Sequence, residues 1–288
     1  MSVFARLDNP LVAYFDQPSD VQLMRLYRRR NPVNRTRIVL VDRRQMVSFG
    51  RFRPRIDAVF RQPGYPRRQP NTANADYSAA MHAKYELIRR TVVDNPFASR
   101  FYCWLDLGLF RDLLPPHSEG ENLVADLSND NSDDAPIRLR LPVGFQENRV
   151  AYTEVNKPRS YPNALSVEDI VRHDYTWVCG CFFVGRADKM ATLGVDYMRA
   201  VDRMLDEGWM STDQQVLYWM FHGDGRRPSI EIQTYSQRDG SRGQYNTWFY
   251  LAYLAKEAGD KTPEVKTGNV THYRTFERRK SYPRRKDS

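Results

Sequence analysis

The stretch that decides the fold is residues 95–112, with the sequence NPFASRFYCWLDLGLFRD. Residues 101–105 form an apolar, mostly aromatic run that is too short for a helix, so it predicts a strand covered on both faces, as at the centre of an α/β sheet. Asp106 follows where this strand should end. Ligands of open α/β sheets bind outside the carboxyl ends of the strands, so Asp106 is a candidate ligand-facing acid. The alternative is that Asp106 and Gly108 only form a turn.

Strands and helices are expected to alternate around this stretch. We predict strands at residues 11–15, 36–41, 176–185 and 229–233, and helices at 18–27, 76–93, from Met190 to near Gly208, from 212 to about 222, and 247–256. A strand, a helix and a strand in succession indicate a parallel pair. We therefore predict one α/β domain over residues 1–256, with a central, mostly parallel sheet flanked by helices. Residues 118–135 would form an acidic loop and residues 257–288 a basic flexible tail.

Composition limits the class of protein. A hydrophobic content of 41% in 288 residues allows a sizeable core, and no apolar run approaches the ~20 residues of a membrane helix. The start of the chain has no secretory pattern, so we expect a soluble, cytoplasmic protein. The net charge of +9 could indicate a nucleic-acid partner. However, the excess falls in short clusters and near the C-terminus, without a known nucleic-acid-binding motif, so that partner is disfavoured.

The three cysteines are Cys103, Cys179 and Cys181. Cys179 and Cys181 are two residues apart in an expected strand, so they should share a face and are not expected to bridge each other. The absence of a CxxC or Cys/His pattern argues against structural zinc. Free thiols in a reducing compartment fit this set best.

Three further positions are candidates for a site. Lys84 lies at the edge of the buried stripe of its helix, so it either extends to water or reaches the crevice and meets a phosphate. Gly180 interrupts an apolar strand, which often marks a bulge or a close approach of a ligand to the backbone. Asp213 lies within Ser211-Thr212-Asp213-Gln214, a capping-box sequence, so helix capping competes with a functional role.

Taken together, these segments resemble the HtrL/YibB family, which in turn resembles glycosyltransferases of the GT-A fold. The resemblance covers roughly residues 9–235. It is carried by Asn9-Pro10-Leu11-Val12, the helix with Lys84, Asn95-Pro96-Phe97, Trp104-Leu105-Asp106-Leu107-Gly108, Gly180-Cys181-Phe182-Phe183-Val184-Gly185 and Thr212-Asp213-Gln214-Gln215. It implies a single GT-A-like domain that binds a nucleotide sugar.

The resemblance also implies a divalent cation, Mn²⁺ or Mg²⁺, held on the donor diphosphate by the acid at Asp106. GT-A enzymes usually place a second acid two residues later, where this chain has Gly108, which is assigned to substrate binding. One carboxylate makes a poor site for such ions, so either phosphate oxygens, water and another side chain complete the coordination or no metal is used. Asp112 and His222 are the candidates for a second metal ligand, although a single histidine after a helix is more often a surface or capping residue.

The roles implied for the other residues follow from the same resemblance. Lys84 would bind the donor phosphates, and Asp106 would bind the cation or the donor sugar. Gly180 would allow close approach of the sugar, Gln214 would bind substrate, and Asp213 would act as the acceptor-side base or as a sugar ligand. The leading hypothesis is transfer of a sugar from a nucleoside-diphosphate donor to a hydroxyl acceptor. The alternatives are a non-catalytic nucleotide-sugar or carbohydrate-binding protein and a basic nucleic-acid-associated protein.

Overall fold

The computed structural model describes residues 2–109, 136–158, 165–225, 228–237, 247–258 and 271–272. Its elements in chain order are α1 (Ser2–Arg6), β1 (Leu11–Phe15), α2 (Pro18–Tyr27), η1 (Val33–Arg35), β2 (Thr36–Leu40), η2 (Arg43–Gln45), η3 (Ser48–Phe52), α3 (Arg53–Phe60), α4 (Ala75–Asp94), β3 (Phe101–Leu105), β4 (Ile137–Leu139), β5 (Arg149–Glu154), α6 (Val167–Arg172), β6 (Val178–Arg186), α7 (Ala187–Asp206), α8 (Asp213–His222), β7 (Glu231–Tyr235), η5 (Thr247–Phe249), α9 (Tyr250–Ala255), β8 (Lys256–Ala258) and β9 (Thr271–His272). The predicted α/β class is confirmed.

The main sheet has the strand order β3-β6-β5-β7-β9. Only β5 and β7 pair in parallel, and the other three neighbouring pairs are antiparallel. The sheet is therefore mixed, which corrects the predicted mostly parallel arrangement. The alternation of strands and helices was a poor guide here because long connections let a strand return in either direction.

The strand β3 lies at one end of this strand order, not at its centre. Its side chains are nevertheless half-buried on both faces, because Tyr102 and Trp104 pack against one core cluster while Cys103 and Leu105 pack against the other. The apolar run therefore predicted the strand and its two covered faces, but not its position in the sheet.

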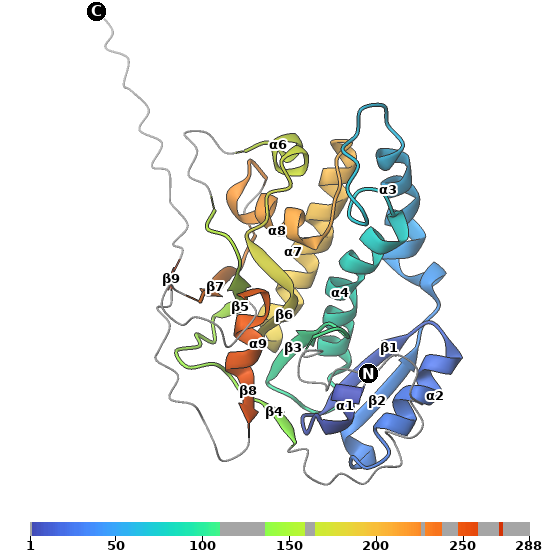
Figure 1. The fold of residues 1–288 in the computed structure, drawn as a ribbon, viewed down its shortest axis with the longest axis vertical. Helices are drawn as coiled ribbons and strands as arrows, with labels where there is room; N and C mark the ends of the chain where they lie inside the picture. The colour runs from blue at the N-terminus through green and yellow to red at the C-terminus, as the bar shows by residue number, and fades with distance from the viewer. Residues whose placement is uncertain are drawn as a thin grey trace, which may run out of the picture.

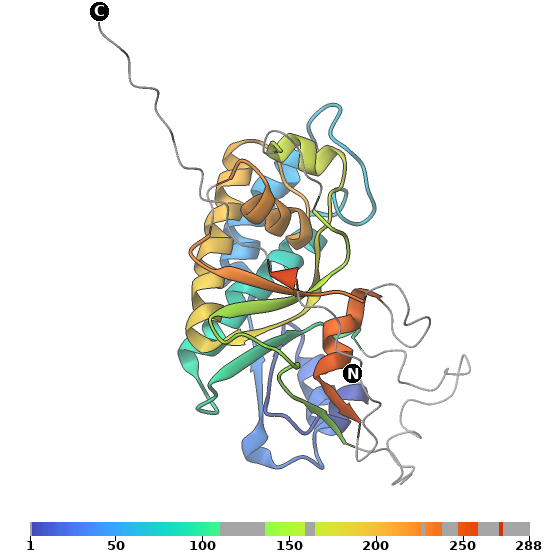
Figure 2. The ribbon, with the colours of Figure 1, turned by 90° about the vertical axis from the view of Figure 1, so that its left-hand side faces the viewer.

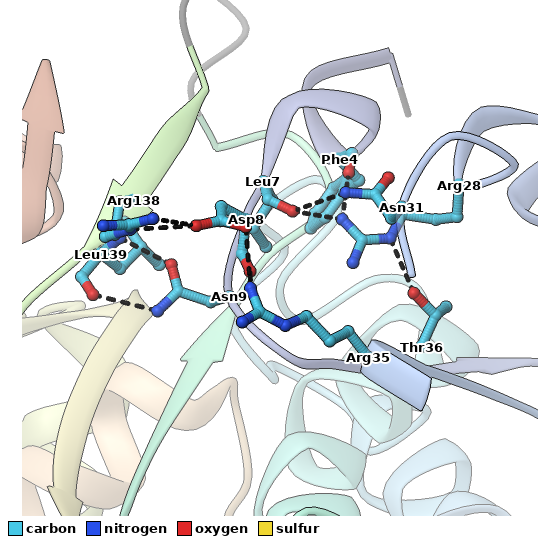
Figure 3. A network of polar contacts seen from close by, with 10 residues as sticks. All are labelled: Phe4, Leu7, Asp8, Asn9, Arg28, Asn31, Arg35, Thr36, Arg138 and Leu139. Carbon is cyan, nitrogen blue, oxygen red and sulfur yellow. Dashed lines mark hydrogen bonds and ion pairs between the residues drawn. The ribbon is translucent and has the colours of Figure 1, made fainter. Parts of the chain in front are cut away.

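The first βαβ unit forms as predicted, but as a separate small sheet. β1 and β2 pair in parallel, with Leu11 opposite Thr36 and Phe15 opposite Leu40, and α2 connects them. A polar network links this unit to β4 (Figure 3). Asp8 accepts hydrogen bonds from Arg35 at 2.9 Å and from Arg138 at 3.0 Å.

Helices cover the main sheet on one side, where α4 and α7 run alongside each other (Figures 1 and 2). Stacked aromatic rings join the helices to the sheet: Tyr85 of α4 lies 3.5 Å from Tyr197 of α7 and 5.3 Å from Phe183 of β6, measured between ring centroids. The other face of β6 packs against α9, with Phe182 and Leu251 in the second core cluster. Both long helices match their predicted positions.

Local sequence sets the ends of α4. The side chain of Asn74 accepts a hydrogen bond from the backbone N–H of Tyr77 at 3.0 Å, which caps the first turn. Asn95 ends the helix in a left-handed conformation (φ 38°), a geometry that asparagine tolerates better than most residues, and Pro96 prevents continuation. The chain can therefore turn directly into β3.

His82 on α4 is completely buried, with Nδ1 2.7 Å from the Tyr197 hydroxyl. Burial lowers its pKa to about 3. The unfolded chain takes up this proton near pH 6.5, so the free energy of unfolding should fall as the pH drops from about 6.5 toward 3, by at most about 1.4 kcal/mol per pH unit from this group. Urea unfolding of wild type and His82→Gln between pH 4 and 7 checks this prediction: the variant should show the shallower pH dependence. Equal slopes would contradict it.

Two predicted segments, the acidic loop 118–135 and the basic tail 257–288, lie wholly or largely outside the described residues. Asp112, a candidate metal ligand, also lies outside them. Of the predicted tail, residues 257–258 continue β8, which pairs with β4, and residues 271–272 form β9, which pairs with β7. Every helix in the described part of the chain is too short or too polar to cross a bilayer.

Candidate functional site

Four residues from distant parts of the chain meet at one point. Lys84 Nζ on α4 lies 2.9 Å from Asp106 Oδ2 after β3, and 3.3 Å from Asp213 Oδ2 at the start of α8. The same ammonium donates a hydrogen bond to the carbonyl of Gly180 in β6 at 3.2 Å. The structure thus brings together four of the predicted site residues.

Asp106 is held at the carboxyl end of β3 by contacts on both sides. Its backbone N–H donates to the carbonyl of Cys181 at 3.0 Å, which continues the pairing of β3 with β6. Its Oδ1 accepts a hydrogen bond from the indole N–H of Trp104 at 2.6 Å, while Oδ2 faces Lys84. The Trp-x-Asp spacing therefore puts the indole and the carboxylate on the same side of the chain, because alternate residues of a strand share a face.

A bulge in β6 brings Gly180 to this point. Consecutive residues Tyr152 and Thr153 of β5 pair with Phe183 and Cys179, so residues 180–182 have no partner on β5. A Cβ atom at Gly180 would lie 1.8 Å from Asp213 Oδ2. Of the two alternatives for Gly180, the bulge is present, and the group that approaches the glycine is the carboxylate of Asp213.

Asp213 is the first residue of α8 and is only 3% exposed. The cap of this helix is formed one residue later than the sequence pattern indicated: Gln215 Oε1 accepts from the backbone N–H of Thr212 at 3.3 Å and from its hydroxyl at 2.9 Å. Since Thr212 and Gln215 cap the helix, the side chain of Asp213 is available to Lys84.

Burial and charge act against each other at this site. Burial alone would lower the pKa of Lys84, but Asp213 and Asp106 outweigh it and raise that pKa above its ordinary value. Burial raises the pKa of Asp213, an effect that Lys84 opposes and Asp106 reinforces. One positive charge is thus shared by two carboxylates, of which Asp213 is sealed and Asp106 is 30% exposed in its side chain.

A cavity of about 400 Å³ opens beside the three charged groups. Gln214, predicted as a substrate-binding residue, lies in its wall together with Gly180. Five residues that were not candidates from the sequence also line it: Asn71, Tyr77, Met81, Trp248 and Phe249. Tyr77 precedes Lys84 by seven residues, two helical turns, and could have been found from that spacing. The sequence around Trp248 gave no comparable signal.

Two predicted residues lie apart from this cavity. Gly108 is exposed in the turn that follows β3 and is not part of the cavity wall. His222 is nine residues after Asp213, at the far end of α8, roughly 13 Å along the helix. Its ring packs edge-on against Trp177, with 4.3 Å between the ring centroids, so His222 is a half-buried packing residue and lies away from Asp106.

The residues at Asp106 do not fit the divalent-metal site that the resemblance implies. Mg²⁺ requires close to octahedral oxygen coordination. Here Asp106 Oδ1 accepts from Trp104, and the Oδ2 atoms of Asp106 and Asp213 both face Lys84. Within the described ranges, no group of three or more His, Cys, Asp or Glu side chains is placed to hold a metal ion.

The expectation that Cys179 and Cys181 do not bridge each other is wrong, because the structure joins them in a disulfide. Their Cα atoms are 5.4 Å apart, closer than the ~6.6 Å between alternate residues of an extended strand and within the usual range for a disulfide. The bulge at Gly180 shortens this distance. The disulfide also contradicts the prediction of three free thiols, on which the reducing compartment was based.

The disulfide gives a direct chemical prediction. Cys103 is the remaining cysteine and is free. Protein unfolded in denaturant without a reductant should therefore show one reactive thiol per chain with a chromogenic thiol reagent, and three after reduction. Three thiols before reduction would contradict the bridge. In the folded protein Cys103 should react slowly, because burial raises its pKa to about 11.

Comparison with protein-family models, with characterised proteins and with solved structures finds no match to this chain. The fold and the site therefore define the protein only by class: a mixed α/β protein whose polar cavity is flanked by one buried lysine and two aspartates.

Proposed function

We propose that this cavity binds a nucleotide sugar and that the protein transfers the sugar to an acceptor hydroxyl. The observation that carries the proposal is the meeting of Lys84, Asp106 and Asp213 beside an open cavity. A volume of about 400 Å³ lies within the ~300–1,000 Å³ typical of small-molecule sites. The resemblance to GT-A glycosyltransferases supports the choice of ligand.

Each side chain has a role in this proposal. Asp106, which is partly exposed, accepts hydrogen bonds from sugar hydroxyls, while Tyr77 and Trp248 offer apolar faces to the ring. Asp213 is the base that takes the proton from the acceptor hydroxyl, and its raised pKa suits proton transfer near neutral pH better than an ordinary aspartate. Lys84 keeps the two carboxylates in place.

Isothermal titration calorimetry with a panel of UDP- and GDP-sugars, with and without Mn²⁺, tests the binding step. At least one member should bind. Asp106→Asn should weaken that binding by roughly 10- to 100-fold, the scale of one lost hydrogen bond to a charged group. The matched control is Asp188→Asn, an aspartate paired with Arg186 outside the cavity wall, which should leave binding unchanged. No binding across the panel, or full binding by Asp106→Asn, would remove the proposal.

A second candidate function is binding of the nucleotide sugar without transfer. It is favoured by the burial of Asp213, which is 3% exposed and already engaged with Lys84. Chromatographic measurement of nucleoside diphosphate release separates the two functions. Release with acceptor present supports transfer, whereas binding without release supports the second candidate.

A further inference from the structure

The ammonium group of Lys84 has used all its hydrogen-bonding capacity inside the protein. It carries three N–H donors. It makes three polar contacts: with Asp106 Oδ2 at 2.9 Å, with Gly180 O at 3.2 Å and with Asp213 Oδ2 at 3.3 Å. No N–H is left to contact a phosphate of the ligand directly.

The same three oxygens would be the natural ligands for a metal ion at this point. A Mg²⁺ ion binds oxygen at about 2.0–2.1 Å. An ion bound to either Oδ2 atom would lie within about 5.4 Å of Lys84 Nζ, because each of these oxygens is within 3.3 Å of that nitrogen. Like charges so close in a buried site repel each other strongly. Lysine and metal therefore exclude each other here.

We infer that Lys84 is a resident cation that takes the place of a divalent metal between Asp106 and Asp213, so that the cavity binds its sugar through the carboxylates without a metal ion. The statement about the metal rests on geometry alone, while the statement about the sugar rests on the proposed function. Lys84 then acts on the ligand through the two acids, as a positioning residue.

The charges of the cavity wall indicate which part of the ligand lies there. Lys84 is the one cationic residue among the described residues that line the cavity, and two carboxylates outnumber it. A net negative wall repels a diphosphate, whereas neutral sugar hydroxyls donate hydrogen bonds to carboxylates. The aromatic side chains of Tyr77 and Trp248 in the wall supply apolar surface for contact with a saccharide ring. The cavity is thus the site of the sugar, with the diphosphate extending out of it.

The first part of the inference, that no divalent metal binds between Asp106 and Asp213, can be tested without any sugar. The test is a titration with Mn²⁺, followed by the electron paramagnetic resonance signal of the free ion. Wild type should bind no Mn²⁺ ion at Asp106 with a sub-millimolar dissociation constant. Its titration should therefore match that of Asp106→Asn. Lys84→Ala, which vacates the position between the acids, should bind Mn²⁺ at least about tenfold more tightly than wild type, because metal affinity rises with the net negative charge of the ligand set. Lys84→Ala/Asp213→Asn should lose this gain. Lys189→Ala, a lysine that flanks Asp188, is the matched control and should gain nothing.

The Mn²⁺ titration of wild type tests the claim about the metal even if Lys84→Ala does not fold. A tight Mn²⁺ site in wild type that depends on Asp106 and Asp213 would overturn the inference and leave the proposed function standing.

The second part of the inference is that the sugar binds without a metal ion. The nucleotide sugar found by calorimetry should therefore bind equally, within about twofold, in EDTA and in Mn²⁺, since no metal ligand needs to be supplied. Binding that requires Mn²⁺ would overturn it. If no nucleotide sugar binds at all, the proposed function fails and the Mn²⁺ result still stands.

Discussion

Lys84→Met should lower the free energy of unfolding by about 3–5 kcal/mol at pH 7, the usual cost of leaving a buried charge without its partner. The side chain of Lys84 is 5% exposed and that of Asp213 is 4% exposed, so water cannot replace the lost ammonium. Chemical denaturation at constant pH measures the effect. Lys189→Met, at the surface, should change stability by no more than about 0.5 kcal/mol.

The stability of Lys84→Met should also depend on pH in a definite direction. Without Lys84, the pKa of Asp213 in the folded protein should rise further above its unfolded value, because burial raises it and the opposing cation is gone. A carboxyl group of this kind stabilises the fold when protonated, and that contribution is lost as the pH rises through the folded pKa. The difference from wild type should therefore shrink at acidic pH. Lys84→Met/Asp213→Asn should regain part of the stability at pH 7. A loss in Lys84→Met no larger than in Lys189→Met would contradict the buried ion pair.

Gly180→Ala is the second change with a large expected effect. Its new Cβ would lie 1.8 Å from Asp213 Oδ2 and 2.8 Å from Cγ, so the carboxylate must leave its position beside Lys84. We expect a loss of about 1–3 kcal/mol in the free energy of unfolding, as for other overpacked sites, and at least tenfold weaker ligand binding. Denaturation and calorimetry measure the two effects.

A double-mutant cycle isolates the cause. In an Asp213→Ala background, Gly180→Ala should cost much less, because the group it collides with is absent, giving a coupling energy of roughly 1–2 kcal/mol. Gly185→Ala is the matched control in the same strand: its Cβ would meet Met190 and Val150 instead, so it should combine additively with Asp213→Ala. Additive behaviour of Gly180→Ala would show that the contact with Asp213 is not what excludes a side chain there.

Much of the local structure follows from the sequence. The helix 76–93 is framed by Asn74 and Asn95, and the interruption of an apolar strand by Gly180 indicated a bulge. The resemblance to GT-A glycosyltransferases assigned Asp106 and Asp213 to one expected site, and the structure brings both acids to one lysine. The helix ends and the strand interruption depend on residues close together in the chain, whereas the meeting of the two acids was expected only from the resemblance.

The features that the sequence did not predict depend on contacts between distant segments. The direction of β6 against β3 and the edge position of β3 come from the path of long connections. The Cys179–Cys181 bridge depends on the distance of 5.4 Å to which the bulge brings the two Cα atoms, and that distance cannot be read from the sequence. The place of Trp248 in the cavity wall depends on how η5 packs against β6. A linear pattern carries no information on such distances.

The most direct test of the central claim, one ammonium shared by two carboxylates, is nuclear magnetic resonance of protein with labelled lysine side chains, titrated upward from pH 9. Lys84 should stay protonated beyond pH 10.5, while exposed lysines titrate near their ordinary value, because Asp213 and Asp106 outweigh the effect of burial and raise its pKa. In Asp106→Asn its pKa should fall. A Lys84 signal that titrates at or below pH 10.5 in wild type, or that is unchanged in Asp106→Asn, would contradict the account.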